Sequence, residues 1–186
     1  MYDLEFYQYT CPSGQYSPLA TLLFNTEGGT IRTIMNNNLQ TSFAEISLFM
    51  IVWYLLTITT YGIWVPSGLF LPGIIIGCAF GQFYAQIIDV LFPETYAANI
   101  NNQSYKIMGA SAMLGGYTRL TYSLCVIMLE TTQSINFFIP ILFSVLTSVS
   151  VGNYFNRGLY EVALRAKNVP LLRNNVPDSQ TETTAF

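Results

Sequence analysis

Long apolar runs dominate the chain, and their lengths predict helices that cross a membrane. No Asp, Glu, Lys or Arg occurs from Ile46 to Ile88, and none occurs from Thr131 to Asn156. A bilayer core of roughly 30 Å requires about 20 apolar residues in helical form. The pattern therefore predicts long helices over 43–62, 70–92 and 135–153, and with them an all-α, polytopic membrane protein.

Two shorter apolar segments lie between the second and third long helices. Residues 106–116 and 119–130 each predict a helix of only roughly 15–18 Å, because a helix rises about 1.5 Å per residue. Neither helix spans a bilayer alone, so we expect a re-entrant pair that is buried among other helices. A short and more charged helix is predicted over 157–167.

The remaining segments are polar. Residues 1–42 are predicted to form a lumenal or extracellular loop region with one short helix over 29–37, and residues 93–105 a second exposed loop. Transmembrane helices are expected within 43–168, and a polar cytosolic tail over 169–186. These boundaries are the domain organisation that the sequence predicts.

Composition and charge support a membrane protein. Hydrophobic residues make up 52% of the chain and charged residues 9%, whereas a soluble domain carries about 25% charged residues. A soluble protein with very apolar core helices is therefore disfavoured. Basic residues gather near the C-terminal end, at Arg157, Arg165, Lys167 and Arg173. By the positive-inside rule this end lies in the cytosol and residues 1–42 on the opposite side.

Candidate catalytic chemistry is sparse. The chain has no histidine, which excludes His-based catalysis and His-based metal sites. Cys78 and Cys125 lie in apolar segments and are expected to be packing residues, and Cys11 has no obvious partner within the chain. No set of nucleophile and base is visible. The sequence therefore predicts neither an enzyme nor a nucleic-acid-binding protein.

The stretch GIWVPSGLFLPGIIIGCAFG at 62–81 places helix breakers inside an apolar run. Irregular backbone at membrane depth is tolerated only inside protein or beside water. A helix that starts there presents free N–H groups and the positive end of its dipole, and Pro72 in its first turn has no N–H to lose. The break at Gly68–Pro72 thus predicts a site for an anion or a polar substrate. A kink or a tight packing site is the alternative, since glycines recur every fourth residue from Gly73 to Gly81.

Several blocks in this chain resemble one family. GLFLP at 68–72 resembles the GxFxP signature of the CLC chloride channel and transporter family. GASAMLGGYTRLTYSLCVIMLE at 109–130 resembles the paired short helices that follow this signature, and GNYFNRGLYEVALRAKNVPLL at 152–172 resembles the last membrane helix. CPSGQYSPLATLLFN at 11–25 is similar to the lumenal loop of the late-endosomal and lysosomal branch. The resemblance extends from about Cys11 to Leu172.

The resemblance implies a chloride site. Backbone N–H groups of Leu69 and Phe70, next to Gly68, and the hydroxyl of Tyr160 would face the ion. A phenol and two amides can replace water around a monovalent anion without a full positive charge. For Tyr160, an interfacial belt tyrosine is the alternative. Arg119 and Glu130 lie at the ends of a proposed short helix and are expected to be terminal anchors.

The resemblance also implies partners and a location. The family is built from tilted, re-entrant and broken helices in two inverted halves, and it acts as a homodimer in the lipid bilayer. Chloride is the substrate, a proton is coupled in exchangers, and no cofactor is implied. The lysosomal branch implies an endosomal or lysosomal membrane.

Two family motifs are absent from this sequence, namely the GSGIP-type loop that supplies a serine and the GxExP-type loop that supplies a gating glutamate. The chain thus resembles the C-terminal half of a CLC membrane domain. We expect a fragment of a voltage-gated chloride channel or chloride/proton exchanger, with a reduced protein as the alternative. A non-transporting membrane element that packs with a partner chain is the second functional hypothesis.

Overall fold

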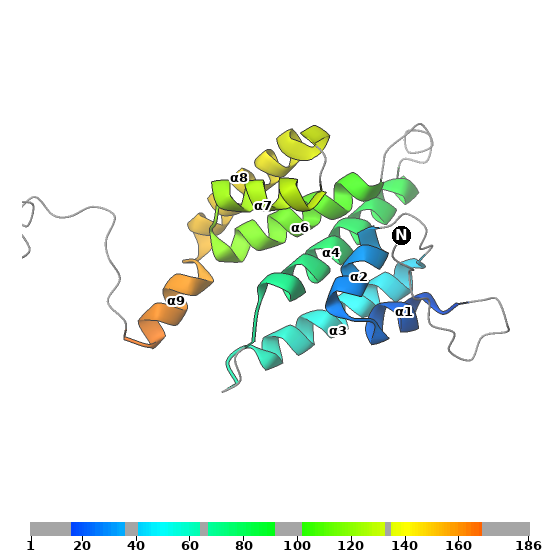
Figure 1. Cartoon of the computed structure of the whole chain (residues 1–186), viewed down its shortest axis with the longest axis horizontal. Helices are drawn as coiled ribbons and strands as arrows, with labels where there is room; N and C mark the ends of the chain where they lie inside the picture. Colours follow the sequence, from blue (N-terminus) through cyan, green and yellow to red (C-terminus); the bar gives the residue numbers. More distant parts are fainter. Residues whose placement is uncertain (1–15, 36–40, 64–66, 92–101, 133–134, 169–186) are drawn as a thin grey trace, which may run out of the picture.

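The computed structural model describes residues 16–35, 41–63, 67–91, 102–132 and 135–168, and within these ranges all regular secondary structure is helical (Figure 1). This confirms the all-α class. The elements in chain order are α1 Pro18–Phe24, α2 Glu27–Met35, α3 Phe43–Thr60, α4 Phe70–Leu91, α6 Asn102–Thr118, α7 Tyr122–Thr132, the 3₁₀ turn η1 Ile135–Phe137, α8 Phe138–Phe155 and α9 Leu159–Ala166.

Three stretches are long and apolar enough to cross a membrane. They are α3, α4 and the continuous stretch Ile135–Phe155 that joins η1 to α8. Each lies within about two residues of a predicted span, because an apolar run sets its own helical length. The other helices are shorter, down to the eight residues of α9. The predicted set of very unequal helices is confirmed.

Two predicted elements differ from the structure. Residues 18–24 were expected in a loop but form α1, which begins at Pro18 and buries Leu22 completely. Seven residues are too few for an apolar period to be visible, so this helix depends on tertiary packing. α6 has 17 residues and begins at Asn102, so its predicted length over 106–116 is wrong, and so is the part of the predicted loop over 93–105 that falls on 102–105. Predictions for 1–15, 93–101 and 169–186 lie outside the described residues.

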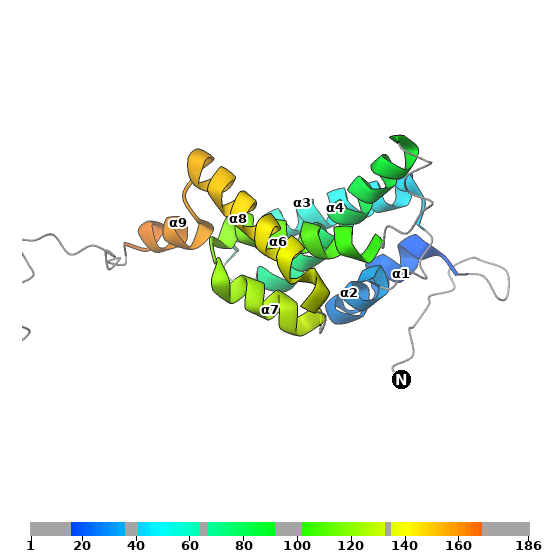
Figure 2. The same cartoon turned by 90° about the horizontal axis from the view of Figure 1, so that it is seen from above.

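The centre of the fold is the contact between α4 and α6, which lie side by side (Figures 1 and 2) and pack more extensively than any other pair of the described helices. A methyl group placed on Gly77 would lie 2.6 Å from the Ala110 Cα, and one on Gly109 would meet the Gly77 carbonyl oxygen. The two backbones are thus in direct contact. The close helix packing predicted from the glycine spacing is confirmed.

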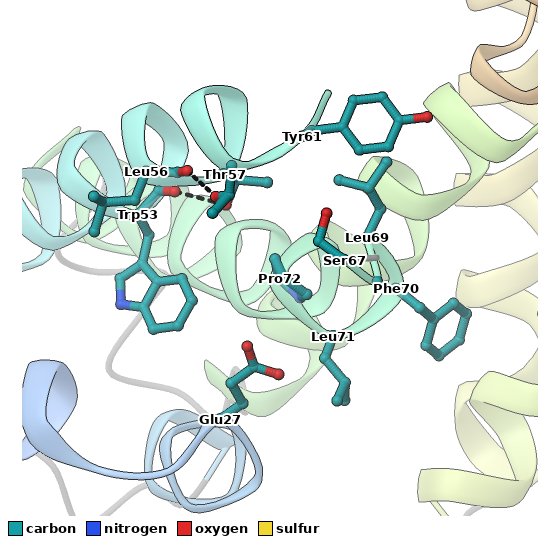
Figure 3. Close-up of a pocket in the computed structure, with 12 residues that line it drawn as sticks. Glu27, Trp53, Leu56, Thr57, Tyr61, Ser67, Leu69, Phe70, Leu71 and Pro72 are labelled. Carbon is teal, nitrogen blue, oxygen red and sulfur yellow. Dashed lines mark hydrogen bonds between the residues drawn. The ribbon is translucent and has the colours of Figure 1, made fainter. Parts of the chain in front are cut away.

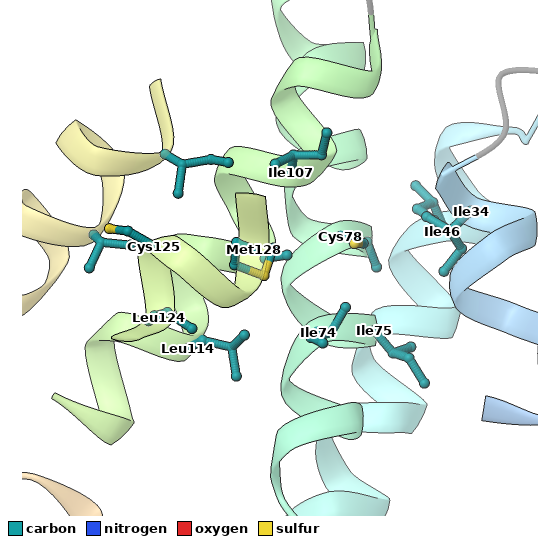
Figure 4. Packing of buried hydrophobic residues seen from close by; sticks show 14 of the residues in the cluster. Ile34, Ile46, Ile74, Ile75, Cys78, Ile107, Leu114, Leu124, Cys125 and Met128 are labelled. Carbon is teal, nitrogen blue, oxygen red and sulfur yellow. The ribbon is translucent and has the colours of Figure 1, made fainter. Parts of the chain in front are cut away.

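Apolar side chains fill both sides of α4 (Figure 4). Ile75 and Cys78 face the helices α2 and α3, where Ile34 and Ile46 are buried. On the other side Leu114, Leu124 and Met128 join α6 and α7 to the same cluster. Cys78 and Cys125 are buried free thiols, which agrees with their predicted role in packing.

A buried lysine joins α6 to α2. The side chain of Lys106 is only 2% exposed, and its Nζ donates to the Ile34 carbonyl at 2.7 Å. Ile34 lies in the last turn of α2, where carbonyl groups have no partner within the helix. The ammonium group therefore caps this helix end and holds it against α6.

Apolar side chains also cover the outer faces of α3 and α8. Leu55, Leu56 and Ile58 of α3 and Phe143 of α8 are each more than half exposed. Contiguous apolar faces of this kind mark contact with lipid or with further helices. The described residues therefore form a core with apolar surfaces on two of its sides.

Candidate anion site

The broken segment ends where α4 begins. α3 stops at Thr60, and α4 starts at Phe70, with the Leu69 carbonyl accepting the first helical hydrogen bond from the Gly73 N–H at 3.0 Å. The N–H groups of Phe70 and Leu71 are in the first turn and so have no partner within the helix. Pro72 stands in this turn, as predicted. The start of α4 thus presents N–H groups and a positive dipole end to the break.

A cavity of about 450 Å³ lies beside this helix start (Figure 3). Its walls are the C-terminal half of α3 and the segment Ser67–Pro72, and Glu27 of α2 lies across from Pro72. An alanine methyl group at Gly68 would have no neighbour within 4 Å. Leu69 and Phe70 line the cavity, and the missing side chain of Gly68 leaves open space beside the backbone.

The segment that carries Tyr160 shares a cavity with the start of α4. This second cavity, of about 430 Å³, is lined by Leu69 and Gly73 of one segment, by Leu159 of the other and also by Tyr117. Tyr160 itself is 49% exposed and is not among the residues that line this cavity. The structure thus brings the two segments together, whereas the convergence of the Tyr160 hydroxyl with Leu69 and Phe70 stays a prediction.

Tyr117 is a polar contact of this region that the sequence did not single out. Its Oη donates to the Leu69 carbonyl at 2.9 Å. The one visible signal is its position as the only aromatic residue in the small-residue run GASAMLGGYT. Such a signal does not identify which carbonyl the hydroxyl will reach.

Arg119 fixes the chain just before α9. It lies between α6 and α7 with a positive φ of 60°, and so it stands at a helix end as expected. Its guanidinium turns inward, however, and donates to the carbonyls of Val149 at 3.4 Å and Asn156 at 3.0 Å. Glu130 is exposed in α7. Arg119 is therefore a link between helices rather than only a terminal anchor.

The hydrogen-bond donors at the start of α4 are neutral, and Glu27 is the one acidic residue among those that line the first cavity. Within the described ranges no group of three or more His, Cys, Asp or Glu residues is placed to hold a metal ion. Backbone N–H groups, phenols and a helix dipole offer partial positive charge, which suits an anion that must also leave. The arrangement can bind a small monovalent anion reversibly.

Comparison with known proteins gives a consistent match. A family model described as voltage gated chloride channel matches residues 9–153. Chloride channel protein C of Dictyostelium discoideum is 35% identical over 184 residues, which cover 95% of this chain and 23% of that protein. The H(+)/Cl(−) exchange transporter 7 of Bos taurus is 33% identical over 183 residues, which cover 96% of this chain and 22% of that protein.

A solved structure shows the same arrangement of helices. The crystal structure of a eukaryotic CLC transporter matches with a TM-score of 0.64 and 35% sequence identity, over 75% of this chain and 24% of that one. The chain thus spans about a fifth to a quarter of the length of the proteins that it matches.

Proposed function

Since the chain belongs to the voltage-gated chloride channel family, we propose that it forms part of a chloride channel or chloride/proton exchanger and supplies part of the chloride site. The observation that carries this proposal is the start of α4 at Phe70. Phe70, Leu71 and Pro72 of its first turn line a cavity of about 450 Å³, and Leu159, the residue before Tyr160, lines a second cavity together with Leu69.

The proposed site binds chloride by neutral donors alone. The N–H groups of Leu69 and Phe70 face the ion, Gly68 leaves the approach open, and the Tyr160 hydroxyl donates a further hydrogen bond. The α4 dipole adds partial positive charge at the same point. A lysine or arginine at this position would retain the ion, whereas amides and a phenol allow it to exchange. These donors therefore suit conduction or transport rather than storage.

The remaining chloride ligands have to come from outside these 186 residues, because the sequence contains neither a GSGIP-type nor a GxExP-type motif. The similarity to an H(+)/Cl(−) exchange transporter supports coupling to a proton. The block CPSGQYSPLATLLFN at 11–25, which is similar to the lumenal loop of the late-endosomal and lysosomal branch, favours an endosomal or lysosomal membrane. The exposed apolar side chains of α7 and α8, among them Val126 and Phe143, offer a surface for a homodimer in the bilayer.

Chloride flux from liposomes tests the proposal. Three samples are prepared. The first contains the 186-residue chain alone, and the second contains this chain with a second chain that supplies the first-half motifs of a family member. The third contains the first-half chain alone and is the control. We expect flux only from the combined chains. Flux from the 186-residue chain alone would contradict the proposal that the two chains together form the chloride site.

The same experiment separates transport from the alternative of a non-transporting membrane element. If the two chains assemble, as judged by co-purification, and still move no chloride, the transport function is refuted. The chain would then act as a membrane element that packs with a partner.

A further inference from the structure

Tyr117 makes a contact that the proposed chloride site does not yet use. The residue lies in the last turn of α6, and its side chain reaches across to the start of α4. Its Oη donates to the Leu69 carbonyl, 48 residues away in sequence, at 2.9 Å. The same carbonyl accepts the Gly73 N–H at 3.0 Å. Both lone pairs of the Leu69 oxygen are thus engaged.

The Leu69 carbonyl and the Phe70 N–H belong to one peptide group. A peptide group is planar, and in the trans form its C=O and N–H bonds point in opposite directions. The described residues contain no cis peptide bond. Whatever fixes the direction of the Leu69 carbonyl therefore also fixes the direction of the Phe70 N–H.

We infer that Tyr117 is a positioning residue for the chloride site, because its hydrogen bond to the Leu69 carbonyl aims the Phe70 N–H at the ion. This inference rests on the proposed function of the site. The first peptide of a helix has only one end inside the hydrogen-bonded ladder, so its plane can tilt. A second donor on its oxygen restricts that tilt and polarises the N–H through the peptide group.

The packing around Tyr117 supports a fixed position for its hydroxyl. A methyl group added to Gly73 would collide with the Tyr117 Oη, and it would lie 3.0 Å from the Tyr117 ring atoms Cε1 and Cζ. The absence of a side chain at Gly73 is thus what admits the hydroxyl to the Leu69 carbonyl.

The test uses the combined chains in liposomes and observes the Leu69–Phe70 peptide by NMR. The 186-residue chain carries ¹³C-carbonyl leucine and ¹⁵N-phenylalanine, which selects the five Leu–Phe peptides of the sequence. The signal that is lost in Leu69→Ile is that of the Leu69–Phe70 peptide. In Tyr117→Phe we expect the Leu69 carbonyl resonance to move even without chloride. In the chloride titration we expect the Phe70 amide to respond with an affinity roughly two- to tenfold weaker, as the loss of one neutral hydrogen bond implies.

Tyr54→Phe is the matched control. Tyr54 lines the second cavity, as Tyr117 does, and this substitution also removes only a phenol oxygen. We expect it to leave both signals unchanged. Gly73→Ala tests the Tyr117–Leu69 hydrogen bond without changing Tyr117. The added methyl group should displace the Tyr117 hydroxyl and reproduce the effect of Tyr117→Phe. The two substitutions together should weaken chloride binding little more than either alone.

The outcomes are separable. If the Phe70 amide of the unsubstituted protein does not respond to chloride, the proposed site fails, and the role of Tyr117 fails with it. If that amide responds and Tyr117→Phe leaves its chloride affinity unchanged, only the role of Tyr117 is refuted. A loss of thermal stability in Tyr117→Phe with an unchanged Phe70 response would identify a purely structural hydrogen bond.

Discussion

Arg119 and Asn156 are joined across the fold, because the Arg119 Nη2 donates to the Asn156 carbonyl at 3.0 Å. Asn156 follows the last residue of α8 and begins the linker to α9. The same guanidinium lies against Gly152, and the Cγ of Arg119 lies against Gly158, so a side chain at either glycine would collide with Arg119. One arginine thus holds the linker that places Tyr160.

Replacement of Arg119 by methionine should release this linker. Hydrogen bonds to a charged group contribute about 1.5–3 kcal/mol when buried. Since Arg119 is only half-buried, we expect a loss of about 1–2 kcal/mol in the free energy of unfolding. Amide exchange should become faster in α9 and stay unchanged in α4.

Arg157→Met is the control for this substitution. Arg157 is exposed and forms an ion pair with Glu161 at 3.7 Å, so its replacement should change stability by no more than about 0.5 kcal/mol. Equal effects of the two substitutions would show that Arg119 does not hold the linker.

Gly109→Ala should strongly destabilise the protein. The added methyl group would meet the Gly77 carbonyl and would lie 2.8 Å from the Gly81 nitrogen. Both neighbours are backbone atoms that cannot rotate away, and we expect a loss of about 1–3 kcal/mol or more in unfolding experiments in detergent.

Gly115→Ala in the same helix is the matched control for Gly109→Ala. Its methyl group would make an ordinary contact with Val145 at 3.5 Å. We therefore expect little change, or a small gain from the better helix propensity of alanine. A destabilisation as large as that of Gly109→Ala would contradict direct backbone packing of α4 on α6.

Tyr160→Phe should weaken chloride binding without abolishing it. The substitution removes one donor to a charged partner, which contributes about 1.5–3 kcal/mol, whereas the amides of Leu69 and Phe70 remain. Calorimetric titration of the combined chains should show an affinity lower by roughly ten- to a hundredfold. The control is Tyr122→Phe, which alters a tyrosine that is 78% exposed. Unchanged affinity in Tyr160→Phe would leave Tyr160 as an interfacial tyrosine.

The C-terminal end of α4 and the C-terminal end of α9 should face opposite sides of the membrane. α4 ends at one extremity of the helical core, and α9 lies at the other (Figure 1). The positive-inside rule places Lys167 in the cytosol. Cysteines introduced at Val90 and at Lys167, in a chain without Cys11, should therefore react with an impermeant thiol reagent from opposite sides. Labelling of both from the cytosolic side would refute this topology.

Much of the fold could be predicted from the sequence, because its signals are local. Apolar runs set the three long spans, and Pro72 and the glycines before it set the start of α4. The glycine spacing at Gly77 predicted close packing, although it did not name α6 as the partner. α1 could not be predicted, since seven residues show no period and Leu22 is buried only by the rest of the fold.

The sequence by itself therefore determined the class of protein, the broken helix and the family blocks that point to Leu69, Phe70 and Tyr160. Only the tertiary structure decided that Tyr117 meets Leu69, which lies 48 residues away, and that Arg119 turns inward to Asn156. A periodic pattern reports the faces of one helix and not its partners. A hydrogen bond between distant segments depends on how helices pack, and the 13 tyrosines of this chain are alike until that packing is known.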